Sequence, residues 1–95
     1  MCGIYARLSY YKSLCIYDKT VIQLKKLTHR GKDGIGIAVD TKDGLIITKE
    51  VINKDVLTND VDKIGNILGD MSIGHTRYKT KGKVSKKNCQ PFVYK

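Results

Sequence analysis

The sequence lacks the features of a secreted or membrane-bound chain. None of its apolar runs approaches the length of a membrane span, and residues 1–20 contain no unbroken apolar core of a signal peptide. Its cysteines, Cys2, Cys15 and Cys89, are odd in number and have no Cys-x-x-Cys spacing, which argues against a disulfide framework and a zinc site. We therefore expect a cytoplasmic protein without metal, cofactor or membrane partner, in which Cys15 and Cys89 are small buried residues.

Acidic residues are scarce relative to basic ones. Nine Asp and Glu stand against 18 Lys and Arg, so the formal net charge is +9. Such an excess suggests an anionic partner, which could be nucleic acid, a phosphate ligand or the acidic face of another subunit. Aromatic residues make up only 7% of the chain, and no long basic block occurs outside residues 79–87. A solvated lysine-rich surface is the simpler interpretation, with nucleic-acid binding kept as an alternative.

The first half of the 95 residues predicts a strand, a helix and a hairpin within a single domain. Residues 3–8 have the composition of a strand, and residues 9–13 that of a polar loop. A helix is predicted from about Asp18, which could cap its start, to near Gly31, because apolar residues recur at helical spacing. Two apolar runs around a short glycine-containing turn then predict a β-hairpin, with strands at 35–39 and 45–52.

The second half predicts a further helix and two strands. Leu57, Val61, Ile64 and Leu68 form one apolar stripe, which indicates a helix that ends at Gly69. Residues 71–78 are expected to form a strand, residues 79–88 a basic loop and residues 90–95 a last short strand. The resulting order of strands and helices is that of an α+β fold.

Cys2 directly follows the initiator methionine and is a candidate nucleophile. If Met1 is removed, Cys2 carries both a thiol and a free α-amine. An α-amino group titrates at about 7.7–8.0, so a useful fraction is neutral near pH 7 and can act as a base. Nucleophile and general base would then belong to one residue, as in enzymes with an N-terminal threonine nucleophile.

Four motifs occur together in a characteristic order: MCGI at 1–4, HRGKDGIGIA at 29–38, GHTRYKTKG at 74–82 and NCQPF at 88–92. This set resembles the N-terminal glutaminase domain of the class II glutamine amidotransferases, most closely its amidophosphoribosyltransferase branch. The resemblance implies an N-terminal-nucleophile hydrolase fold, an αββα sandwich, of which residues 1–95 would form a single truncated domain with an antiparallel sheet and two helices. It also implies hydrolysis of glutamine to glutamate and ammonia, with the ammonia passed to a synthase domain.

The resemblance assigns roles to individual residues. Cys2 would attack the side-chain amide of glutamine, and Arg77 would bind the substrate α-carboxylate, a task that suits a planar, always-charged guanidinium. Thr80 would add a hydroxyl hydrogen bond, and Tyr78 would form the pocket wall. His75 receives no catalytic role and is expected to be a hydrogen-bonded structural residue. The turn beneath the nucleophile would be supported by three residues: Arg30, Gly31 and Asp33.

Two elements of the family have no counterpart within these 95 residues: the Asn-Gly pair of the oxyanion hole and the aspartate that binds the substrate amine. Three hypotheses therefore stay open. The chain is a minimal or split glutaminase, a non-catalytic binding or assembly protein derived from that domain, or a basic nucleic-acid-binding module. Because half a sandwich leaves an apolar sheet face uncovered, we also expect a homodimer or a partner chain that completes the fold.

Overall fold

The computed structural model describes residues 2–51 and 67–94, and it contains one helix and a four-stranded sheet. This arrangement confirms the predicted α+β class. Within these residues, no helix is long and apolar enough to cross a membrane. The elements are, in chain order, β1 (Gly3–Ser13), α1 (Ile16–Lys26), β2 (Gly34–Thr41), β3 (Gly44–Val51), β4 (Gly69–Arg77) and the 3-10 turn η1 (Lys86–Asn88).

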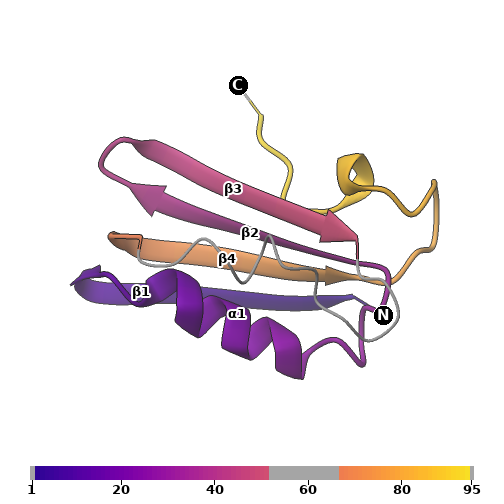
Figure 1. Cartoon of the computed structure of the whole chain (residues 1–95), viewed down its shortest axis with the longest axis horizontal. Coiled ribbons are helices and arrows are strands. Elements are labelled where there is room, and N and C mark those ends of the chain that lie inside the picture. The colour runs from indigo at the N-terminus through magenta and orange to yellow at the C-terminus, as the bar shows by residue number, and fades with distance from the viewer. Residues whose placement is uncertain (1, 52–66, 95) are drawn as a thin grey trace.

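The four strands lie in the order β1-β4-β2-β3, and every neighbouring pair is antiparallel (Figure 1). The predicted hairpin is confirmed, since β2 and β3 are joined by a tight turn between Thr41 and Gly44. At the other end of the sheet, Gly3 of β1 pairs with Thr76, and Gly34 of β2 pairs with Arg77. The start of β1, the end of β4 and the start of β2 therefore meet at one corner of the sheet.

Helix α1 covers one face of the sheet and forms the core with it (Figure 1). Its apolar residues recur at helical spacing and so lie on one side of the helix. They pack on alternate residues of β2, which point to the same face because strand side chains alternate. The residues of this core that are no more than 5% exposed are Ile16, Tyr17, Val21, Leu24, Ile35, Ile37 and Val39.

The opposite face of the sheet, which we call the open face, retains exposed apolar side chains. On β1, Ile4 and Leu8 are 76% and 77% exposed, and they lie opposite His75 and Met71 of β4. Residues 91–94 border a groove of about 210 Å³ on this face, next to β2, β3 and β4. An apolar face of this kind commonly contacts another protein surface. The expectation of a homodimer or a partner chain stays a prediction.

Three predicted local features differ in the structure. Residues 9–13 continue β1 instead of forming a loop, because the pairing with β4 resumes at Ser13 opposite Gly69 after an irregularity. Residues 90–94 form no strand, since the segment crosses the open face above Gly36 of β2, where no strand edge is available for pairing. Cys15 is exposed, whereas Cys89 is buried as expected.

The first predicted helix is confirmed but lies earlier in the chain than expected. It begins at Ile16 with Cys15 as its N-cap residue, so Asp18 belongs to the first turn and is not the cap. It ends at Lys26, after which the amides of Leu27 and Arg30 bond to carbonyls three residues back. The second predicted helix falls almost entirely on residues 52–66, outside the described residues.

Candidate active site

The Cys2 thiol lies against the end of β4. The backbone N–H of Tyr78 approaches the Cys2 Sγ at 3.4 Å, and the Sγ lies 3.9 Å from the Tyr78 carbonyl oxygen. Cys2 itself is exposed. Continuing the β1–β4 register by one residue beyond Gly3 and Thr76 brings Cys2 opposite Arg77. Because directly opposed residues share one face of a sheet, Cys2 and Arg77 both lie on the open face.

The Arg77 guanidinium is buried and holds the loop that follows β4. Its Nη1 donates to the Lys83 carbonyl at 2.8 Å, and its Nη2 donates to the Lys81 carbonyl at 2.7 Å. Arg77 is only 7% exposed, so these charge-assisted bonds offset part of the cost of removing the guanidinium from water. Arg77 thereby fixes the backbone of residues 81–83 next to the corner that holds the thiol, which we call the thiol corner.

Asp33 ties the start of β2 to the same corner through two hydrogen bonds. Its backbone N–H donates to the Arg77 carbonyl at 2.8 Å, and its Oδ2 accepts the Lys79 backbone N–H at 2.6 Å. Gly31 lies just before this clamp and passes so close to β4 that a Cβ atom would overlap the carbonyl group of Thr76. Only glycine permits this approach. The predicted role of both residues in supporting the turn beneath Cys2 stays a prediction.

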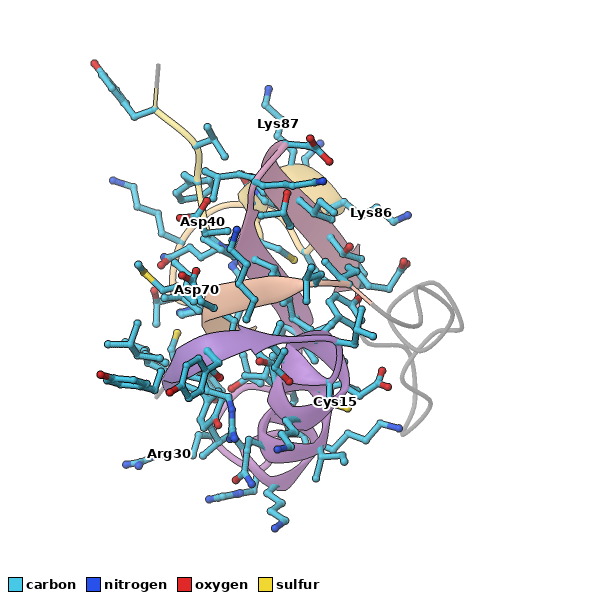
Figure 2. The ribbon with its side chains drawn as sticks, turned by 90° about the vertical axis from the view of Figure 1, so that its left-hand side faces the viewer. Cys15, Arg30, Asp40, Asp70, Lys86 and Lys87 are labelled. Carbon is cyan, nitrogen blue, oxygen red and sulfur yellow. The ribbon has the colours of Figure 1, made fainter. Side chains whose placement is uncertain are left out.

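The structure therefore brings most of the predicted site residues together at the end of β4. These are Cys2, Gly31, Asp33, Arg77 and Tyr78. Tyr78 is 46% exposed and touches the thiol through its backbone. Thr80 is exposed within the loop that Arg77 holds. Arg30 is exposed, and Figure 2 shows it beside α1. The roles assigned to these residues stay predictions.

Thr76 is a further residue of this corner that the sequence analysis did not single out. Its Oγ1 accepts the Gly3 backbone N–H at 3.1 Å and donates to the Leu27 carbonyl at 3.2 Å. The side chain is fully buried. A threonine in a strand is ordinary, so only the alternation of side chains along 74–78 could have indicated that Thr76 faces α1.

His75 is buried on the open face, and its Nδ1 has no hydrogen-bond partner within the described part of the chain. Among the described residues, the expected hydrogen bond is thus missing at this atom. Burial lowers the pKa of His75 from its ordinary value of 6.5, and the positive charge of Arg77 lowers this pKa further. The neutral ring is therefore the form that the fold favours.

This shift predicts a pH dependence of stability. Because the pKa of His75 is lower in the folded than in the unfolded chain, the unfolded chain binds the proton more readily. The stabilising contribution is complete above pH 6.5 and is lost as the pH falls below that value. We expect the denaturant midpoint to decrease between about pH 7.5 and pH 5.5, and to decrease less in His75→Gln. Equal decreases in both proteins would contradict the assignment to His75.

Cationic side chains also lie on parts of the molecule other than the thiol corner. In Figure 2, Arg30 lies beside α1, whereas Lys86 and Lys87 lie beyond the opposite side of the sheet, close to β3. Lys86 also forms an ion pair of 3.3 Å with Glu50. The positive charge is thus spread over opposite ends of the molecule, as in a solvated lysine-rich surface.

Comparison with known proteins relates the chain to a family. The chain is 38% identical to an amidophosphoribosyltransferase of Methanocaldococcus jannaschii over 96 aligned positions, which cover 100% of this chain and 20% of that protein. It is 44% identical to a glutamine–fructose-6-phosphate aminotransferase of Francisella tularensis, over 74% of this chain and 12% of that protein. The chain is homologous to the N-terminal region of class II glutamine amidotransferases.

A plant amidophosphoribosyltransferase is also similar to the chain. An amidophosphoribosyltransferase of Arabidopsis thaliana is 42% identical over 76% of this chain and 13% of its own length. The chain therefore spans about a fifth or less of the length of these three amidotransferases. No protein-family model matches it, and no solved structure matches it. The predicted relationship to the glutaminase domain is confirmed at the level of sequence.

Proposed function

We propose that this chain carries the nucleophile of a glutamine-hydrolysing domain and that Cys2 attacks the side-chain amide of glutamine. The observation that carries the proposal is the position of the Cys2 Sγ, exposed at the end of β4 and 3.4 Å from the Tyr78 backbone nitrogen. The thiol is thus reachable from solvent and held against the backbone at the end of β4. Homology to amidotransferases supplies the substrate class.

The reaction follows from the chemistry of one residue. After removal of Met1, the neutral α-amine of Cys2 takes the proton of the thiol, and the thiolate attacks the amide carbon of glutamine. The tetrahedral intermediate expels ammonia, which leaves with a proton from the α-ammonium group, and a thioester of Cys2 is formed. Water then hydrolyses the thioester to give glutamate and the free thiol.

Substrate binding is assigned to Arg77 and to the loop that it holds. A guanidinium carries five N–H donors in a planar fork, and two of those of Arg77 already bond to the loop carbonyls. Donors that remain can bind the α-carboxylate of glutamine on the open face, which Arg77 shares with Cys2. Thr80 would add a hydroxyl from the same loop, and the ring of Tyr78 would form a wall of the pocket.

Ammonia release from glutamine tests the proposal, with Arg77→Lys as the informative variant. Lysine keeps the charge but loses the planar fork, so we expect KM for glutamine to rise about 10- to 100-fold, with a smaller change in kcat. The control is Arg7→Lys, because the Arg7 guanidinium bonds to the Tyr5 hydroxyl within β1 and takes no part in holding the loop. A KM equal to that of the wild type would remove Arg77 from the substrate site.

A non-catalytic binding or assembly function is the second candidate. The exposed apolar side chains of the open face favour it, because Ile4, Leu8 and Ile73 offer a surface for another protein. The two functions differ in their dependence on Cys2. Protein that releases no ammonia although mass spectrometry shows Cys2 at its N-terminus would support the binding function.

A further inference from the structure

The side chain of Thr76 joins three parts of the fold at the thiol corner. Its Oγ1 accepts the N–H of Gly3, the residue next to Cys2, and donates to the carbonyl of Leu27 at the end of α1. Leu27 is the C-cap of α1, where helix carbonyls lack partners within the helix. One buried hydroxyl thus links the start of β1, the end of β4 and the end of α1.

The contact at Gly3 is close enough to define the position of the chain. A Cβ atom at residue 3 would stand 2.5 Å from the Thr76 Oγ1 and 3.0 Å from the Leu27 Cβ. Glycine is therefore required by the approach of the hydroxyl, and the backbone at residue 3 has little room to move. Because Cys2 is bonded to Gly3, the hydroxyl limits where the thiol can lie.

This restraint matters because Cys2 lies at the end of an edge strand. Among the described strands, β1 pairs only with β4, and strand ends that lack a second neighbour tend to fray. The backbone N–H of Tyr78 donates to the thiol at 3.4 Å. Fraying at Gly3 would move the Sγ away from that donor.

We propose that Thr76 is a positioning residue that holds the Cys2 thiol at the Tyr78 N–H through the backbone of Gly3. The inference rests on the proposed glutaminase function for its kinetic consequence. It does not require Thr76 to touch substrate, since the hydroxyl is buried on the face that α1 covers. Its loss should therefore reduce turnover more than substrate binding.

The test compares Thr76→Val with Thr76→Ser and with Thr20→Val. Valine has the shape of threonine without the hydroxyl, and serine restores the hydroxyl. Thr20 of α1 is an equally buried threonine between the helix and the sheet. Its Oγ1 bonds to the Ile16 carbonyl at 2.7 Å and to the Ser72 Oγ of β4 at 2.6 Å. Thr20→Val therefore removes a comparable pair of buried bonds at a position away from Cys2.

For Thr76→Val we expect kcat for ammonia release to fall about 10- to 100-fold, with KM within about twofold of wild type. Thr76→Ser should restore most of kcat, and Thr20→Val should leave it near the wild-type value. Amide exchange followed by NMR should accelerate at Gly3 and Tyr78 in Thr76→Val only. Melting temperatures are measured first, and all assays are run well below the lowest of them.

Each outcome decides the question. Equal kinetics and equal exchange in Thr76→Val and Thr20→Val would overturn the proposal, because both would then reflect general loss of stability. If wild-type protein with a free Cys2 N-terminus releases no ammonia, the proposed function fails, and the exchange of Tyr78 alone decides whether Thr76 holds the thiol. If Thr76→Val does not fold, Thr76→Ala replaces it, since the smaller side chain leaves room for water to reach the Gly3 N–H, while the Leu27 carbonyl keeps its bond from the Arg30 N–H.

Discussion

Replacement of Cys2 by alanine is expected to reduce ammonia release from glutamine to the background rate. Alanine supplies no nucleophile, and loss of a catalytic nucleophile alone can cost about 10⁴- to 10⁶-fold in kcat. The substitution removes only a sulfur atom at an exposed position, so the melting temperature should change little. Ammonia is measured at saturating glutamine, with the intact mass of the protein recorded to establish that Met1 has been removed.

Cys15 provides the matched control for this experiment. It is also a free, exposed cysteine, but it lies at the start of α1 and not at the thiol corner. Cys15→Ala should therefore keep the wild-type rate. If Cys2→Ala retained ammonia release within about tenfold of the wild type, the attack by Cys2 would be refuted, and the activity would have to come from another group or a contaminant.

The thiol corner could be predicted in part because its residues belong to short, distinctive sequence motifs. Cys2, Arg77 and Asp33 occur in motifs that the resemblance covers, and the structure brings their backbones together. Thr76 escaped notice because its role depends on two contacts that are distant in sequence, with Gly3 and with Leu27. No local pattern indicates such contacts, so they require the assembled sheet.

The same distinction explains which elements were predicted correctly. The β2–β3 hairpin follows from local turn chemistry, and its strands were found with small errors at their ends. The extension of β1 through residues 9–13 depends on pairing with the distant strand β4, which the polar composition of that segment conceals. Cys15 illustrates a similar limit, because a preference for burial says nothing about which side of a helix start faces water.

Truncation of Leu24 to alanine is expected to cause the largest loss of stability in the described core. Leu24 is fully buried, and its side chain lies directly over Gly74 of β4, where a Cβ atom would overlap both Cδ atoms. Removal of the Leu24 side chain would leave a cavity next to Gly74, and a glycine has no side chain that could move into this space. We expect the free energy of unfolding to fall by about 3–5 kcal/mol, at the upper end for leucine truncation.

A loss of this size is large relative to the stability of so small a domain, which is about 5–14 kcal/mol at typical values per residue. Urea unfolding followed by circular dichroism measures it, and Ile22→Ala in the same helix is the control. Ile22 is 53% exposed, and alanine favours helix, so that variant should lose less than about 1 kcal/mol. Similar losses in both variants would mean that α1 does not pack on β4 through Leu24. The anchoring of Thr76 to the end of α1 would then lose its support as well, because the same packing brings Leu27 to the thiol corner.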